Sequence, residues 1–489
     1  MSETPARPLS DGGASHLRRN YLSAIENVAQ SIGTMGPVAT IGTVLPLLIY
    51  KSGNGTWLLL LGIVAAFALI STSVNVFASK FASAGSLATF ANEGLGKWPG
   101  VLTGWSYVVA MIFVVTSSGV SCAYYVSMVA AHFTHMPIGK PGLVLLTVLV
   151  VLAAWWPTYR DIKLSTKVML AAESLSMLLI LFILGAAMVG AHRWIDRSQF
   201  RLEGTDFPHF KLGFVLAFMT LSGFESTTAL GEEAKTATRT LPRVMLLCVL
   251  PIGLLFMAST YCLTTLSHGR NLALDQTDAP LDMIAQSIGL PNLGWISSLG
   301  VAISCFGCAV GAFNAGSRVI YSMARDRHLW RYFEAVHPAN GTPHRSLALF
   351  AVIAIVVPVV MIFEGVTMAD SMDYLMQIAS FGFLGGYLAI CLAAPFYLAK
   401  HGRLGLSRLA IAVVTVAVLG TVFFMSIIPV PDAPWRYLPY IFAGLLALGM
   451  IVTRMSAVTR SRISTPASPA SGGTQPTSSP TEHSARHPG

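Results

Sequence analysis

The sequence predicts an all-α integral membrane protein with about 12 transmembrane helices, and three observations lead to this fold class. Of the 489 residues, 54% are hydrophobic and only 11% are charged, whereas about 25% of a soluble domain is charged. The apolar residues gather into runs of about 20 residues, the length that a helix needs to cross a bilayer. Backbone groups in such runs must hydrogen-bond to one another, as a helix allows. This composition excludes a soluble enzyme, a nucleic-acid-binding protein and a disordered regulator.

The expected helices follow these apolar runs in chain order. We place them at residues 24–49, 57–78, 100–131, 141–158, 168–190, 212–231, 244–266, 294–322, 347–363, 374–398, 409–428 and 435–453. The third and eighth runs are long for a single crossing, which indicates helices that are tilted or that extend beyond the bilayer. The residues ahead of the first run lack the order of a cleaved signal peptide, so we expect the first helix to be retained.

The basic residues predict the orientation of these helices. If both termini lie on one side, 22 of the 31 Lys and Arg residues fall on that side and 8 on the other, with Arg318 inside the eighth run. Positive charge gathers on the cytoplasmic side of membrane proteins. We therefore expect both termini in the cytoplasm and a location in the cytoplasmic (inner) membrane. The net charge of +9 is then explained by the excess of basic residues on the cytoplasmic side. We therefore expect the lipid bilayer rather than a nucleic acid as partner.

The first run contains residues that interrupt a helix. Residues 33–37 read Gly-Thr-Met-Gly-Pro, and two glycines and a proline weaken a helix in mid-membrane. Pro37 suits the first position of a restarted half-helix. Backbone N–H groups around Gly36 and Val38 would then face a cavity with the positive end of a helix dipole behind them, which suits a carboxylate. The alternative is a simple kink, because membrane helices carry Gly and Pro often.

The sixth run supplies a matching irregularity, with Gly223 and Glu225 inside an apolar stretch. Interrupted helices in corresponding positions of two halves indicate a transporter built from inverted repeats. The first and sixth runs stand five helices apart. An odd number of helices in each repeat requires opposite orientations in the membrane.

Two acidic residues, Glu173 and Glu225, lie well inside apolar runs. A carboxylate in a membrane is costly and must share a proton or find a cation, so both are candidates for proton coupling. The alternative is a structural role in which the carboxylate caps unwound backbone N–H groups. No His-Glu-x-x-His, P-loop or Gly-x-Ser-x-Gly element is present in the sequence, so we expect no enzymatic activity, no metal site and no cofactor.

Several segments resemble the amino acid–polyamine–organocation (APC) superfamily, in particular its bacterial amino acid permeases. Residues 222–243, which read SGFESTTALGEEAKTATRTLPR, resemble the signature that follows the sixth helix in that family. Residues 84–105 resemble the connection between its second and third helices. Residues 314–344 resemble its eighth helix and the loop behind it. The resemblance covers about residues 20–455.

This resemblance implies a leucine-transporter-like fold with two inverted five-helix repeats and two further helices. The expected division is a cytoplasmic segment 1–23, a first repeat 24–198, a second repeat 199–398, two more helices in 399–455 and a tail 456–489. The tail is rich in Ser, Thr, Pro and Gly from residue 464 onward, and we expect it to be disordered.

The resemblance also implies a function, namely secondary active transport of an amino acid or related amine by alternating access, with protons as the expected coupling ion. A polyamine or amine carrier and a substrate–product exchanger stay open as alternatives. A sensor that binds amino acids without moving them is a more remote alternative. The sequence leaves the oligomeric state undetermined.

The expected site residues fall into four groups. We expect backbone groups to bind the substrate carboxylate at Gly33, Thr34, Gly36 and Val38. We expect carbonyl groups to bind the substrate amine at Phe218, Ser222 and Gly223, with Phe218 or Met219 as a lid. For the pocket wall we expect Ser118 and Cys122. For a cytoplasmic gate we expect Glu232, Glu233 and Arg325.

Overall fold

A computed structural model describes most of the chain. The described residues are 16–191, 194–202, 207–267, 279–287, 289–290, 292–428, 430 and 432–464. They are almost entirely helical, and no strand occurs among them apart from an isolated β-bridge between Leu22 and Ala234. The all-α prediction is therefore confirmed.

The long helices coincide with the apolar runs, whereas the short helices α4, α8 and α11 lie outside every predicted run. Their bounds are α1 Ala24–Met35, α2 Pro37–Ser52, η1 Gly53–Gly55, α3 Thr56–Ala78, α4 Leu87–Leu95, α5 Lys97–Thr134, α6 Lys140–Arg160, α7 Ile162–Ala191, α8 Arg197–Phe200, α9 Phe207–Phe218, η2 Met219–Leu221, η3 Phe224–Leu230, α10 Ala237–Ser267, α11 Pro280–Ser287, α12 Asn292–Arg325, η4 Arg331–Glu334, α13 His344–Phe363, α14 Met368–Lys400, α15 Leu406–Met425, η5 Trp435–Tyr437 and α16 Leu438–Ser464.

Within the described residues, 10 helical stretches are long and apolar enough to cross a membrane. The first of them, Ala24–Ala78, contains two of the runs we predicted. The sixth predicted run is divided between α9 and η3, so it does not count as one long helix. The total of 12 crossings and the division into repeats stay predictions.

The C-terminal boundary differs from our expectation. We expected disorder over residues 456–489, but α16 continues as helix to Ser464. Two features explain the extension. The Oγ of Ser456 donates to the carbonyl of His328 at 3.1 Å, and the Ser- and Pro-rich composition begins only after the helix ends. Residues 465–489 lie outside the described part of the chain, as do residues 1–15 of the N-terminal segment.

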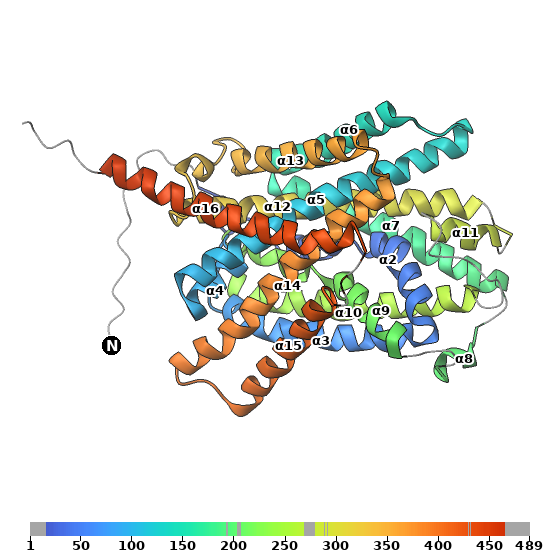
Figure 1. Ribbon diagram of the computed structural model, residues 1–489, viewed down its shortest axis with the longest axis horizontal. Coiled ribbons are helices and arrows are strands. Elements are labelled where there is room, and N and C mark those ends of the chain that lie inside the picture. The colour runs from blue at the N-terminus through green and yellow to red at the C-terminus, as the bar shows by residue number, and fades with distance from the viewer. Residues whose placement is uncertain are drawn as a thin grey trace, which may run out of the picture.

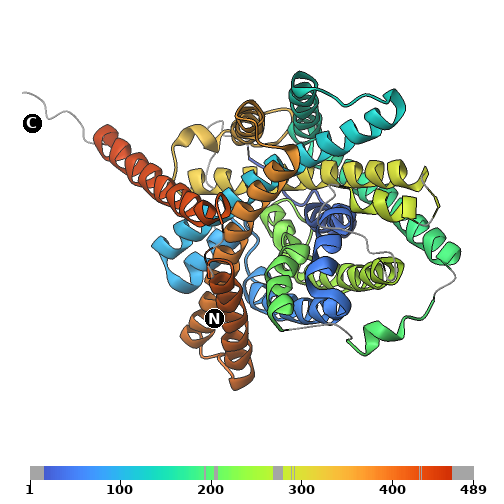
Figure 2. The same cartoon turned by 45° about the vertical axis from the view of Figure 1, so that its right-hand side comes forward.

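Two long helices, α5 and α12, form the centre of the bundle (Figure 1). The most apolar window of α5 is completely buried inside the protein, and 78% of that of α12 is buried. Helices α6 and α13 lie on one flank, and α3 and α15 on the opposite flank (Figure 1). Figure 2 shows that the C-terminal part of α16 extends clear of the other helices.

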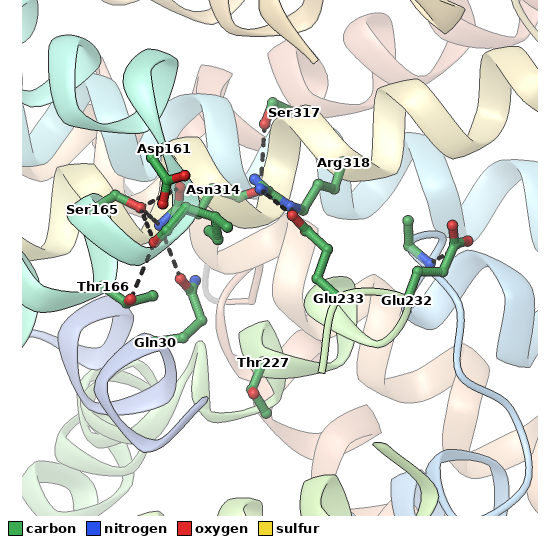
Figure 3. Close-up of polar contacts among 12 residues, drawn as sticks. Gln30, Asp161, Ser165, Thr166, Thr227, Glu232, Glu233, Asn314, Ser317 and Arg318 are labelled. Carbon is green, nitrogen blue, oxygen red and sulfur yellow. Dashed lines mark hydrogen bonds and ion pairs between the residues drawn. The ribbon is translucent and has the colours of Figure 1, made fainter. Parts of the chain in front are cut away.

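A buried ion pair holds one end of the bundle together. Arg318 of α12 donates from Nε and Nη2 to the carboxylate of Glu233, which precedes α10, and both side chains are 0% exposed. The remaining Nη1 donates to the carbonyl of Asn314 at 2.9 Å. Figure 3 shows the two side chains meeting between α12 and the segment after η3. The two charges thus neutralise each other, and each of the three guanidinium nitrogens donates a hydrogen bond. Burial of an ion pair requires both.

The segment ahead of α1 is attached to the same place. The carbonyl of Glu233 accepts the N–H groups of Tyr21 and Leu22 at 2.7 and 2.8 Å. Nearby, Arg18 pairs with Asp161 at the start of α7, and its second terminal nitrogen donates to the carbonyl of Ala339 at 2.7 Å. The chain before α1 therefore ties the start of α7, the loop between η4 and α13 and the segment after η3 together at one end of the molecule.

The ion pair predicts a specific stability pattern. Glu233→Gln should lower the free energy of unfolding by about 3–5 kcal/mol, because it leaves the guanidinium of Arg318 buried without a counter-charge. The double variant Arg318→Met/Glu233→Met should lose much less. Thermal unfolding of the detergent-solubilised protein measures both effects as changes in Tm.

Arg331 and Glu334 provide the control, because their side chains are 86% and 37% exposed. Arg331→Gln should change stability by less than about 1 kcal/mol. A Glu233→Gln protein as stable as the Arg331→Gln protein would contradict the structural role of the buried pair.

Candidate functional site

A cavity of about 70 Å³ lies between the two interrupted helices, and this volume holds several water molecules. Its wall comes from six helical elements. The lining residues are Thr34, Met35, Gly36, Ala39, Thr40, Thr43 and Val44 of α1, α2 and their junction, Val114, Ser118 and Ser121 of α5, Met219 and Ser222 at the second break, Cys305 and Cys308 of α12, and Met376 and Phe383 of α14.

The first interruption is at Gly36, between α1 and α2. Its backbone is left-handed, with φ 54° and ψ 63°. A residue with a Cβ would be strained in this conformation by about 1–2 kcal/mol. The Gly36 N–H donates to the carbonyls of Ile32 and Gly33, both at 3.1 Å, and closes α1. Pro37 then begins α2, where its missing N–H costs nothing.

At this break, backbone N–H and carbonyl groups lack the hydrogen-bond partners that a continuous helix would give them. The Val38 N–H has no hydrogen-bond partner among the described residues. The next N–H, that of Ala39, donates to the Oγ of Ser304 at 3.1 Å. On the other side of the break, the carbonyl of Thr34 accepts the thiol of Cys308 at 3.1 Å. The first turn of α2 therefore offers positive potential, and the last turn of α1 offers carbonyl oxygens.

The second interruption is at Ser222 and Gly223, between η2 and η3. Ser222 is extended and Gly223 is left-handed, with φ 95°. The Gly223 N–H donates to the hydroxyl of Tyr387 at 3.0 Å. The Ser222 carbonyl has no donor within the described chain. A Cβ added to Gly223 would lie 3.0 Å from the Cγ2 of Thr34, so the two breaks are in contact.

Side-chain hydrogen bonds join α1 to η3. The Oγ of Ser31 donates to the carbonyl of Phe224 at 2.8 Å, and the Oγ1 of Thr227 donates to the Oδ1 of Asn27 at 2.9 Å. These bonds place one broken helix directly on the other. A displacement of α1 would therefore carry η3 with it.

A further polar cluster joins α1 to α7 and α12 (Figure 3). The Nδ2 of Asn314 donates to the Oε1 of Gln30 at 3.2 Å and to the Oγ of Ser165 at 3.0 Å. The Nε2 of Gln30 donates to the carbonyl of Gly311 at 2.8 Å. Gln30 thus binds α1 to α12, and Asn314 links this contact to Ser165 of α7.

Glu173 of α7 reaches the first break through one hydroxyl group. Its carboxylate oxygens lie 3.0 and 3.1 Å from the Oγ of Ser304, which also accepts the Ala39 N–H. A Cβ on Gly307 would lie 2.9 Å from the carboxylate, so α12 approaches it closely. Glu173 is 2% exposed, and none of the ion pairs in the described residues includes it.

Glu225 occupies the second break. Its Oε2 accepts the hydroxyl of Tyr387, the same group that accepts the Gly223 N–H. Its Oε1 is buried and has no partner among the described residues, and the hydroxyl of Tyr107 is in the same situation. Glu225 therefore supports the unwound backbone through Tyr387. This arrangement favours the structural role that we left open for it.

The structure brings five of the ten expected substrate residues onto the cavity: Thr34, Gly36, Ser118, Met219 and Ser222. The other five lie behind its wall. Gly33 packs against the side chain of Met169, and Phe218 packs against the ring of Phe67 with centroids 5.3 Å apart. Val38, Gly223 and Cys122 are buried without lining the cavity. The role of each residue in binding stays a prediction.

The expected gate residues form two ion pairs rather than one cluster. Arg325 donates to both carboxylate oxygens of Glu232 at 2.6 and 2.7 Å, whereas Glu233 pairs with Arg318. Burial by itself would raise the pKa of Glu232, but hydrogen bonds from Arg325 and from the Ala84 N–H outweigh it and lower the pKa below the ordinary glutamate value. The pair is therefore fully formed at neutral pH and is lost only as the pH falls through that lowered pKa.

The cavity also contains residues that sequence reasoning missed. The missed residues are Cys305 and Cys308 of α12, which stand three positions apart, and Ser121 of α5, which stands three positions after the expected Ser118. Small polar residues at this spacing share one helix face, so their periodicity inside apolar runs is a signal that could have found them. Phe383 resembles the other apolar residues of α14 in sequence, and no such signal marks it.

Comparisons with known proteins identify the family of this chain. A family model described as amino acid permease matches residues 27–457. An uncharacterized transporter of Mycobacterium tuberculosis is 26% identical over 358 residues, which cover 71% of this chain and 76% of that protein. The branched-chain amino acid permease BcaP of Bacillus subtilis is 24% identical over 59% of this chain and 64% of its own. The low-affinity putrescine importer PlaP of Escherichia coli is 23% identical over 59% and 65%.

These matches confirm the APC resemblance. They identify a multi-pass membrane protein and an amino acid or amine transporter, in agreement with the apolar helices and the two helix breaks. Because the family model extends over nearly all of the described helices, the chain belongs to the amino acid permease family.

Proposed function

We propose that this permease is a secondary active transporter for a small neutral amino acid and that it binds its substrate in the cavity between the two helix breaks. The observation that carries the proposal is the cavity itself, which residues of both helix breaks and of the first turn of α2 line together. Discontinuous helices form the substrate sites of transporters in this way.

The two ends of an amino acid match the two kinds of backbone group. The substrate carboxylate would accept N–H groups of the first turn of α2, with the helix dipole behind them. The N–H of Val38, which lies behind the cavity wall in this structure, would join them only if the wall shifts on binding. The ammonium group would donate to the carbonyls of Thr34 and Ser222. Neither contact needs a charged side chain, because the half-helix termini supply the complementary partial charges.

The cavity wall favours a neutral substrate over a diamine. None of the described residues that line it is acidic or basic. A diamine has two ammonium groups, and burying the second without a counter-charge is costly. Met35, Val114 and Phe383 instead present apolar surface to the substrate side chain. A small aliphatic amino acid satisfies the backbone groups and the apolar wall together.

We further propose that Glu173 carries the coupling proton. An ionised Glu173 accepts a hydrogen bond from Ser304, whereas a protonated Glu173 can donate to the same Oγ. The change reorients the hydroxyl that receives the Ala39 N–H, in the first turn of α2. Protonation at α7 would thereby act on the helix that binds the substrate carboxylate, through atoms that lie 3.0–3.1 Å apart.

Alternating access requires that one end of the site opens while the other closes. The end bearing the N-terminal segment is closed by the pairs of Glu232 with Arg325 and Glu233 with Arg318. We propose that this end faces the cytoplasm in the inner membrane. Release of substrate would require the unit of α1, α2 and η3 to move against α5 and α12 and to break these contacts.

Gly36→Leu should abolish both substrate binding and uptake. The substitution forces a branched side chain into a left-handed backbone, and its Cβ would lie 3.3 Å from the Cβ of Cys308. Gly62→Leu is the matched control, since a Cβ at Gly62 of α3 meets nothing within 4 Å. Thermal-shift binding and proteoliposome uptake of neutral amino acids measure the effect. Undiminished binding and uptake by the Gly36→Leu protein would contradict the proposed site.

Substrate should protect the cavity thiols from a small thiol reagent such as methyl methanethiosulfonate. Cys305 and Cys308 line the cavity, whereas Cys122 and Cys391 are buried elsewhere. The reagent should inhibit uptake several-fold, a transported amino acid should slow the inhibition, and Cys305→Ala/Cys308→Ala should be insensitive. Inhibition that persists in the double variant would show that the reactive thiol lies outside the cavity.

Glu173→Gln should remove the acceleration of uptake by a pH gradient in proteoliposomes, because the amide cannot release a proton. Glu232→Gln is the control. The lowered pKa of Glu232 means that this group does not titrate near neutral pH, so its variant should keep the shape of the wild-type pH profile even if its rate falls. Equal uptake by the wild-type protein with and without the gradient would refute proton coupling.

A further inference from the structure

Helices α3, α14 and α15 lie together on one flank of the bundle (Figure 1). A second pocket is lined by residues of these helices and of the segments next to them. Its volume is about 500 Å³, and it shares no lining residue with the cavity between the helix breaks. It is near the end of the molecule that carries the N-terminal segment, because α3 and α14 end there and α15 begins there. The lining residues are Thr72, Ser73, Asn75, Val76, Ser79, Lys80, Ala394, Pro395, Leu398, Arg403, Ser407, Arg408, Ile411 and Ala412.

Three cationic side chains converge on this pocket, and none of its described lining residues is acidic. Lys80 follows α3, Arg403 lies between α14 and α15, and Arg408 is in the first turn of α15. Within the described chain, neither arginine side chain has an ion pair or hydrogen bond. Among the described residues, the Lys80 ammonium has one partner, Tyr397, whose hydroxyl lies at 3.4 Å and whose ring lies beneath it. Like charges held together in this way favour a bound anion.

A buried polar atom in the same pocket lacks a partner. The Oδ1 of Asn75 is buried and has no hydrogen-bond donor among the described residues, although the Nδ2 of the same side chain reaches the carbonyl of Pro242 at 3.5 Å. A buried acceptor without a donor is costly. A ligand that brings both a negative charge and a hydroxyl group would satisfy the cations and this atom together.

The surroundings of the pocket indicate a membrane lipid as that ligand. Only 22% of the apolar window of α15 is buried inside the protein, so this helix presents most of its surface to the bilayer. Leu409 and Val413, which flank the pocket on α15, are 40% and 60% exposed. Basic pockets between transmembrane helices on the cytoplasmic side bind anionic headgroups. Acyl chains could continue from such a headgroup along the apolar face of α15.

We propose that this pocket binds one anionic phospholipid with a hydroxylated headgroup, of the phosphatidylglycerol type. Its phosphate contacts Arg403, Arg408 and Lys80, and a headgroup hydroxyl donates to Asn75. The lipid bridges α15 to α3 and α14, and thereby stabilises a helix that has few buried contacts of its own.

The test compares phosphatidylglycerol with phosphatidylcholine as additives to the delipidated, detergent-solubilised protein, and measures retained lipid by native mass spectrometry and the shift in Tm. Phosphatidylglycerol should bind and raise Tm in the wild-type protein. In Arg403→Gln/Arg408→Gln, its affinity should fall about 25-fold, because each cation near an anionic headgroup contributes about fivefold.

Two further variants complete the design. Lys167→Gln/Arg454→Gln removes the same number of exposed cations away from the pocket and should bind phosphatidylglycerol as the wild-type protein does. Arg403→Lys/Arg408→Lys keeps the positive charge and should retain most of the affinity.

Three outcomes would overturn the proposal. The first is equal binding of the two lipids by the wild-type protein, and the second is an equal loss of affinity in both glutamine double variants. The third is stabilisation by soluble glycerol 3-phosphate to the same Tm, which would assign the pocket to a free anion.

Discussion

The fold depends on a single constraint, which is that backbone polar groups inside a membrane must find partners within the protein. Two helices of this permease break in mid-membrane, at Gly36 and at Gly223, and each break exposes N–H and carbonyl groups that an intact helix would satisfy. The central pair α5 and α12 keeps these groups away from lipid. The hydroxyl and thiol groups of Ser304, Cys308 and Tyr387 pair with some of them. Residues of both breaks line a small cavity.

The two intramembrane acids are understood through the same constraint. Both are connected to a break, but in different ways. Glu225 accepts a hydrogen bond from the hydroxyl of Tyr387, and the same hydroxyl accepts the backbone N–H of Gly223 at the second break. Glu225 therefore supports the unwound backbone. Glu173 is one hydroxyl group away from the first break, and it has no counter-charge among the described residues. A carboxylate whose hydrogen bond leads to the substrate helix is better placed to link a proton to transport than one that holds the backbone in shape.

Sequence reasoning predicted the helices and both breaks, because apolar runs, glycine and proline act locally. It also identified the acids, since charges are rare in such runs. It did not predict which residues face the cavity, because that depends on the rotation of each helix and on the neighbours it packs against. Gly33 and Gly36 are both glycines of the same interrupted stretch, and the sequence does not tell them apart. In the structure Gly33 packs on Met169, and of the two only Gly36 has a left-handed backbone. Similarly, the partner of Glu233 is Arg318 rather than Arg325, which only the packing of α12 decides.

The most direct test of the central claim is a structure of the permease with a transported amino acid bound, determined in a lipid nanodisc. The substrate should lie between Gly36 and Ser222. Its carboxylate should be within hydrogen-bond distance of the first turn of α2, and its ammonium group should contact the carbonyls of the two breaks. A substrate bound outside this cavity, or held by ionised side chains instead of backbone groups, would contradict the claim.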